Sequence, residues 1–80
     1  MTFPLRIFAI DREVFVGEAK AVTLPSITGQ IQILPQHISL VSLLQEGNLR
    51  IDTEQGSREI PISGGVLEVR PEKTVILVNF

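Results

Sequence analysis

Alternation of apolar and polar residues runs along almost the whole chain, and it restricts the possible folds more than any other feature. Its clearest instance is 30–33, where glutamine and isoleucine alternate, and Leu5 and Ile7 flank Arg6 in the same way. A period of two places successive side chains on opposite faces of a strand, so that one face is buried and the other meets solvent. The chain is therefore predicted to be all-β.

Turn-forming residues divide this pattern into short strands. Proline has no N–H for a ladder, so we expect Pro25 and Pro35 to end strands and Pro61 to mark an edge strand. The apolar segment 38–44 fits a helical stripe as well as a strand, and we interpret it as a strand because it is short. The predicted strands cover 3–10, 13–16, 19–24, 30–33, 38–44, 47–52, 60–62, 66–70 and 74–78.

The short spacing of these strands is typical of a sandwich or a barrel. We predict a single domain over residues 1–80, an all-β sandwich of about ten strands in two sheets that pack face to face. The chain has 80 residues, of which 44% are hydrophobic, and no cysteine. One core must therefore hold the fold together without disulfides.

Composition argues against several classes of function. The net charge is −2 and the seven Lys and Arg residues are scattered, whereas a nucleic-acid binder needs clustered positive charge. No apolar run reaches the roughly 18 residues of a membrane span. The chain has one histidine and no nucleophile-elbow motif, so we expect no catalysis, no metal and no cofactor.

Three local features have competing interpretations. The pair Gly64 and Gly65 is not followed by a helix, so we interpret it as a turn, or as a place where another backbone comes close, rather than as a phosphate site. His37 is interpreted as a turn residue, with a partner contact as the alternative. The segment 74–78 is apolar on both strand faces, which indicates either a partner surface or a cover formed by the chain's own loops.

Four motifs occur in the order and with the spacing of one protein family. The first is a hydrophobic strand that leads into an acidic turn and a Phe-x-Gly element, and the second is a Pro-turn-Gly strand followed by Leu-Pro-x-His. The third is Gly-Asn-Leu-Arg-Ile, and the fourth is Ser-Gly-Gly-Val-Leu-Glu-Val-Arg-Pro running into Val-Ile-Leu. These motifs, at 3–19, 24–37, 47–51 and 63–77, resemble the N-terminal β-sandwich domain of the epsilon subunit of F-type ATP synthases.

The resemblance implies a ten-stranded sandwich in the central stalk, which contacts the gamma subunit and rests on the membrane ring of c subunits. Such a domain is not catalytic by itself, and it couples rotation of the ion-driven ring to gamma for ATP synthesis. It is peripheral on the cytoplasmic face of the bacterial inner membrane. The implied ring contact is Ser26, Ile27, Thr28, Gly29 and Gln30, and the implied contacts with gamma or the ring are Ala9, His37 and Ser42.

The chain departs from the family pattern in two respects. Family members often carry an acidic residue where Arg6 and Gln30 stand, so an ion pair with the ring is not implied at these positions. Most members also continue into a helical hairpin that binds nucleotide or inhibits ATP hydrolysis, and no residue follows Phe80 here. If the protein ends at this residue, we expect coupling to remain while inhibition and ATP sensing by the hairpin are missing; if the chain is a piece of a longer protein, this expectation does not apply.

The alternative from another class is a stand-alone β-sandwich module that binds a sugar or a peptide. Such a module normally presents a cleft in which aromatic side chains converge. The chain has neither Trp nor Tyr, and its four Phe residues are expected in the core. The rotor subunit is therefore the favoured interpretation.

Overall fold

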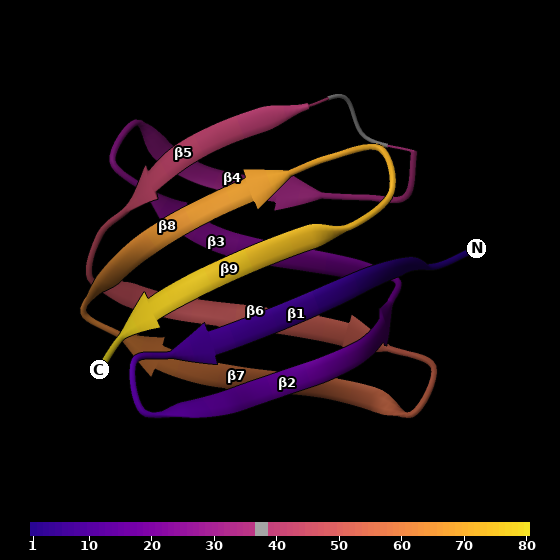
Figure 1. The fold of residues 1–80 in the computed structure, drawn as a ribbon, viewed down its shortest axis with the longest axis horizontal. Helices are drawn as coiled ribbons and strands as arrows, with labels where there is room; N and C mark the ends of the chain where they lie inside the picture. The colour runs from indigo at the N-terminus through magenta and orange to yellow at the C-terminus, as the bar shows by residue number, and fades with distance from the viewer. Residues whose placement is uncertain (37–38) are drawn as a thin grey trace.

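The computed structural model describes residues 1–36 and 39–80. The regular secondary structure in this part of the chain consists of β-strands alone (Figure 1). The prediction of an all-β fold is confirmed, with nine strands where about ten were expected. The strands are β1 (Phe3–Ala9), β2 (Arg12–Ala19), β3 (Ala21–Ser26), β4 (Gly29–Ile33), β5 (Leu40–Leu44), β6 (Gly47–Thr53), β7 (Gly56–Ile62), β8 (Gly64–Val69) and β9 (Thr74–Asn79).

All nine strands belong to one sheet, which curls until its two halves face each other. The strand order is β2-β1-β9-β8-β5-β3-β6-β7, and β4 pairs with β3 outside this path. In Figure 1 the half made of β5, β8, β9, β1 and β2 lies in front of the half made of β4, β3, β6 and β7. The two predicted sheets are therefore two halves of one sheet, joined where Ser26 pairs with Leu44.

The first and last strands lie side by side within the front half. Leu5–Phe8 of β1 pairs in parallel with Thr74–Leu77 of β9, whereas all the other strand pairs are antiparallel. The N- and C-termini lie at opposite ends of the molecule (Figure 1). The last strand is therefore flanked on both sides, by β8 and by β1.

The core lies between the two halves and follows the alternation in the sequence. On β1, Leu5 and Ile7 are fully buried, whereas Arg6 between them is exposed. The other half contributes buried side chains at the same spacing, as at Leu49 and Ile51 of β6. The largest fully buried apolar side chains are Leu5, Ile7, Leu24, Ile33, Leu49, Ile51, Leu67, Ile76, Val22 and Val78.

Pro25 does not end its strand, contrary to the prediction from the sequence. The Pro25 carbonyl accepts a hydrogen bond from the Gln45 N–H (2.8 Å), which lies in the bend between β5 and β6. At this point β3 changes its neighbour from β6 to β5, and neither strand pairs with Pro25 itself. The missing N–H of Pro25 therefore breaks no ladder hydrogen bond. The proline ring occupies space that Gly47 leaves free, since a Cβ at Gly47 would lie 2.9 Å from the Pro25 Cβ.

Two other sequence interpretations agree with the structure. The ambiguous apolar segment is a strand over Leu40–Leu44, while Ile38 lies outside the described residues. Pro61 lies on β7, which is the last strand in the order and therefore an edge strand.

The glycine pair is part of strand β8 and is not itself the turn. Gly65 has a φ of +154°, and a Cβ placed on it would lie 2.2 Å from the carbonyl oxygen of Leu77 on β9. Real Cβ atoms essentially never come this close to a backbone oxygen. Of the two structural interpretations of the pair, the close approach of another backbone is the correct one for Gly65.

Replacing Gly65 with alanine tests this close approach. We expect Gly65→Ala to lower the free energy of unfolding by about 3 kcal/mol, because the new methyl group forces two paired strands apart. For a domain of this size, that loss lowers the melting temperature by about 12–24 °C. Thermal unfolding followed by circular dichroism measures the shift.

Gly17→Ala is the matched control for this measurement. A Cβ at Gly17 would meet only the ring of Phe15, at 3.4 Å, and no backbone atom. We expect the control to shift the melting temperature by less than about 4 °C. Equal shifts in the two variants would show that the contact with the Leu77 carbonyl does not limit the packing of β8.

Candidate docking surface

Five apolar side chains form a row across the outer face of the front half of the sheet. Leu43 lies opposite Val66, Val66 lies opposite Leu77, and Leu77 lies opposite Phe8. Ile27 extends the row, because its N–H donates a hydrogen bond to the Leu43 carbonyl (3.0 Å). The neighbours of the four strand residues are mostly directed inward, so these four side chains point outward, and Ile27 is exposed in the β3–β4 turn. We call these five residues the apolar stripe.

The apolar stripe is open to solvent. Ile27 is 57% exposed, Leu43 54%, Leu77 49% and Val66 38%, while Phe8 is half-buried beneath Arg6. Because Leu77 is this exposed, the interpretation that the chain's own loops cover both faces of 74–78 is wrong for this residue. A contiguous row of exposed apolar side chains is typical of a surface that contacts a partner.

The row next to the apolar stripe mixes apolar and charged side chains. Val41, Glu68, Val75 and Arg6 lie opposite one another across the same four strands. The Arg70 Nε donates a hydrogen bond to Glu68 (2.9 Å), and this bond raises the pKa of Arg70 above its ordinary value. The Arg70–Glu68 pair and Arg6 therefore flank the apolar stripe on one side.

The outer face of the back half is polar and slightly hollowed. Ligand clefts are usually lined by apolar and aromatic side chains. The hollow, of about 650 Å³, has no aromatic residue in its lining and does not fit a stand-alone ligand-binding module. It is lined by Thr23, Pro25, Gln30, Gln32, Gly47, Asn48, Arg50, Asp52 and Glu59.

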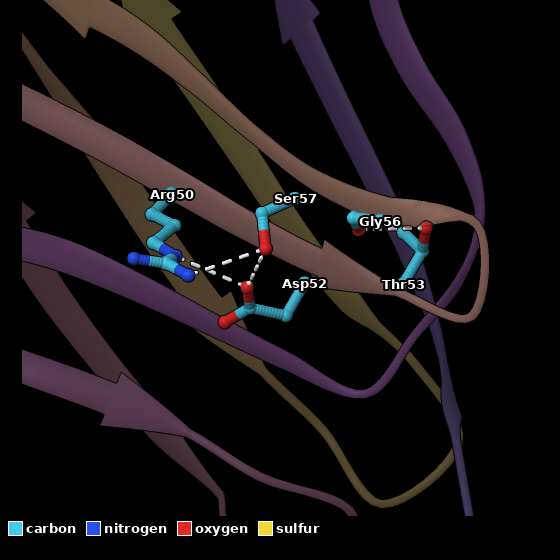
Figure 2. Close-up of polar contacts among 5 residues, drawn as sticks. All are labelled: Arg50, Asp52, Thr53, Gly56 and Ser57. Atoms are coloured by element: carbon cyan, nitrogen blue, oxygen red, sulfur yellow. Dashed lines mark hydrogen bonds and ion pairs between the residues drawn. The ribbon is translucent and has the colours of Figure 1, made fainter.

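Hydrogen bonds between β6 and β7 organise this polar face (Figure 2). Asp52 Oδ1 accepts from the Ser57 hydroxyl (2.5 Å) and from Arg50 Nε (3.0 Å), and Arg50 Nη2 donates to Ser57 Oγ (3.2 Å). The bond from Ser57, and then that from Arg50, hold the pKa of Asp52 below its ordinary value. At the end of the hairpin, the Thr53 hydroxyl donates to the Gly56 carbonyl (3.1 Å).

The described residues show three further properties that bear on function. Within 1–36 and 39–80, no group of three or more His, Cys, Asp or Glu side chains is placed to hold a metal ion. In the same part of the chain, no helix is long and apolar enough to cross a membrane. All buried polar side-chain atoms among these residues have a hydrogen-bond partner.

The turn expected to contact the ring joins β3 to β4, and its residues play different parts. Ser26 is fully buried, its hydroxyl accepts from the Thr28 N–H (3.0 Å), and it bonds the Thr28 hydroxyl (2.9 Å). Ser26 therefore shapes the turn from inside. Ile27, Thr28, Gly29 and Gln30 are exposed and form the accessible part of the turn.

The other three residues implied by the resemblance lie on separate elements. Ala9 is buried at the end of β1, and the turn that follows it lies at the same end of the molecule as the β3–β4 turn (Figure 1). Ser42 is half-buried on β5, next to Leu43 of the apolar stripe. His37 lies outside the described residues. Contacts through these residues and through the turn remain predictions.

Sequence reasoning missed most of the apolar stripe. Only Leu77 belongs to the segment that the sequence singled out, 74–78. Leu43 and Val66 become its neighbours through the register between strands, which alternation within one strand does not determine. The available signal was local, because outward positions of β5 and β8 carry apolar residues where a solvated strand carries polar ones.

Comparison with known proteins identifies a family. The family model described as the ATP synthase Delta/Epsilon chain β-sandwich domain matches residues 2–80. The ATP synthase epsilon chain of Synechococcus sp. (strain CC9311) is 44% identical over 79 residues, and that of Prochlorococcus marinus (strain MIT 9303) is 46% identical over 79 residues. Each alignment covers 99% of this chain, which spans 58% of the first relative and 59% of the second.

Solved structures share the fold. A chain in the cryo-EM structure of the Euglena gracilis mitochondrial ATP synthase superposes with a TM-score of 0.85 at 25% identity, covering 98% of this chain and 49% of that chain. A chain in the cryo-EM structure of the Tetrahymena thermophila mitochondrial ATP synthase central stalk and c-ring also gives a TM-score of 0.85, with 14% identity, covering 100% of this chain and 65% of that chain. At 14% identity, this second similarity concerns the fold alone.

The hydrogen bonds to Asp52 make stability depend on acid pH. Because folding lowers the pKa of Asp52, the ionised carboxylate stabilises the fold above the unfolded pKa, and this contribution disappears as the pH falls through the folded pKa. We expect Asp52→Asn to be less stable than the unmodified chain at pH 7, and the difference to shrink as the pH falls below the ordinary aspartate pKa of about 4 and through the lower folded pKa. Urea unfolding at several pH values measures the gap.

Ser57→Ala provides the companion variant, because it removes the largest cause of the lowered pKa while keeping the carboxylate. It should reduce the loss of stability in acid without abolishing it. A gap between Asp52→Asn and the unmodified chain that stays constant from pH 7 to pH 2 would contradict this account.

Proposed function

The chain belongs to the family of ATP synthase Delta/Epsilon chain β-sandwich domains, and on this basis we propose that it acts in the central stalk of an F-type ATP synthase. There it couples rotation of the membrane c-ring to the gamma subunit, as a rotor component that catalyses nothing by itself. Its relatives are ATP synthase epsilon chains, which supports this role. We place it at the cytoplasmic face of a bacterial inner membrane.

The apolar stripe is the observation that carries the proposal. Four of its side chains are between 38% and 57% exposed, and covering the exposed part of each contributes roughly 1 kcal/mol. Val66 and Leu77 stand on strands that are paired on both sides, so a partner packed on them meets a rigid surface. Transmission of torque requires this kind of stiff, well-packed contact and needs no reactive group.

The proposed contacts divide between two neighbouring parts of the surface. Gamma covers the apolar stripe, and Ser42 lies beneath Leu43 on the opposite face of β5. The exposed part of the β3–β4 turn rests on the c-ring, and Ala9 supports from inside the β1–β2 turn, which lies at the same end of the molecule (Figure 1). Ile27 belongs to both the turn and the stripe, so the two contacts adjoin.

A charge placed in the apolar stripe tests the proposal. We expect Leu43→Glu to weaken binding to the gamma subunit of the matching ATP synthase by about 30-fold, because apolar contact is lost and a carboxylate is desolvated, together about 2 kcal/mol. Binding is measured by isothermal titration calorimetry with purified gamma. Retained affinity in Leu43→Glu would contradict docking through the stripe.

Asn48→Glu is the matched control. Asn48 is exposed on the polar outer face of the back half, so the variant adds the same charge on the face of the molecule opposite the apolar stripe. We expect its affinity for gamma to stay within about twofold of the unmodified chain, since surface substitutions away from a contact have small effects. Equal losses in both variants would point to net charge instead of the stripe.

A further inference from the structure

Three strands have a whole edge without a strand partner among the described residues, and β5 has a strand partner on its second edge only at Leu44. The three are β2 and β7 at the two ends of the strand order, and β4 beside β3. Such edges present unpaired N–H and C=O groups, and proteins usually protect them with charged residues or proline. On β7 the protection is Arg58, Glu59 and Pro61, and on β2 it includes Arg12 and Glu18.

Strand β4 lacks this protection. Its five residues, Gly29–Ile33, read Gly-Gln-Ile-Gln-Ile and include neither a charge nor a proline. Every residue except Ile33 is exposed or half-buried. An edge of this composition is suited to pair with another extended segment.

The backbone groups of two glutamines point away from the sheet along this edge. Gln30 lies opposite Pro25, whose carbonyl bonds the Gln45 N–H on the other side and whose nitrogen carries no hydrogen. This pair therefore exchanges no hydrogen bonds. Hydrogen-bonded and non-bonded pairs alternate in an antiparallel ladder. Gln32, two residues further along, therefore also forms a non-bonded pair, with Thr23. The N–H and C=O groups of both residues are directed outward.

The side chains of β4 define which segment fits. Gln30 and Gln32 lie on the polar outer face, whereas Ile31 is half-buried against the core. A strand added at this edge would place one side chain beside Ile31 and its two neighbours beside the glutamines. The fitting segment is therefore extended and uncharged, with an apolar residue between residues that form hydrogen bonds.

We propose that β4 accepts, as an added strand, an extended segment of the same subunit that covers the apolar stripe. This inference rests on the proposed function. The stripe and the edge adjoin, because Ile27 of the stripe lies in the turn that leads into β4. Once a subunit is bound to the stripe, its extended segment is held close to β4. The effective concentration of the segment is then high, so that even a short ladder can form.

A second copy of the chain is the less favourable occupant. Only Gln30 and Gln32 offer backbone groups on β4, so two copies would share a short ladder. So few hydrogen bonds would have to hold two copies together without the additional contact that the stripe gives to gamma. The test therefore compares association of the chain with itself and binding of the chain to gamma.

Amide hydrogen exchange, resolved to single residues, tests the added strand in the complex of this chain with gamma. We expect the Gln30 and Gln32 amides to exchange rapidly in the free chain and at least about tenfold more slowly in the complex. The Ile31 amide, which faces β3, should be protected in both states. Gln32→Pro removes one outward N–H and should weaken gamma binding about tenfold, whereas Gln32→Thr keeps the N–H and should change binding less than about twofold.

The outcomes distinguish failure of this inference alone from failure of the proposed function. If the Gln30 and Gln32 amides exchange equally fast with and without gamma, while Leu43→Glu still weakens binding, the added strand is wrong and the rotor proposal stands. If gamma does not bind at all, both are wrong. If these amides become protected in the free chain as its own concentration rises, the occupant is a second copy. If Gln32→Pro unfolds the chain, exchange in the unmodified complex decides the matter.

Discussion

The change of partner along β3 is the constraint on which the rest of the structure depends. β3 pairs with β6 over Ala21–Thr23 and with β5 only at Ser26, so a single sheet divides here into two halves that face each other. Pro25 stands at the division, and the absence of a side chain at Gly47 gives its ring room. The closed core, and the separation of the apolar stripe from the polar outer face of the other half, both follow from this division.

Alternation predicted the fold class well because it reports burial, and each strand has one buried face whichever strands it pairs with. Local rules failed where pairing mattered. The rule that proline ends a strand rests on its missing N–H donor. At Pro25 the strand changes its partner, so no ladder hydrogen bond requires that donor. Gly65 could be a turn or a close contact from its sequence, and only the Leu77 carbonyl across the ladder distinguishes the two.

The candidate docking surface was less predictable than the fold, because it is a property of register. Leu43, Val66 and Leu77 are distant in the chain and form one row only when three strands are aligned. The turn from Ser26 to Gln30 came from family resemblance instead, and burial divides it into an internal residue and an exposed tip. Neither alternation nor resemblance singled out the edge of β4, since an edge exists only relative to the complete sheet.

The parallel pairing of β1 with β9 has a mechanical consequence. The two terminal strands lie side by side while the chain ends point to opposite ends of the molecule. Tension between the ends acts along the strands and across the direction of their hydrogen bonds. It therefore loads the whole β1–β9 ladder in shear at once, whereas tension across a hairpin opens the bonds one after another.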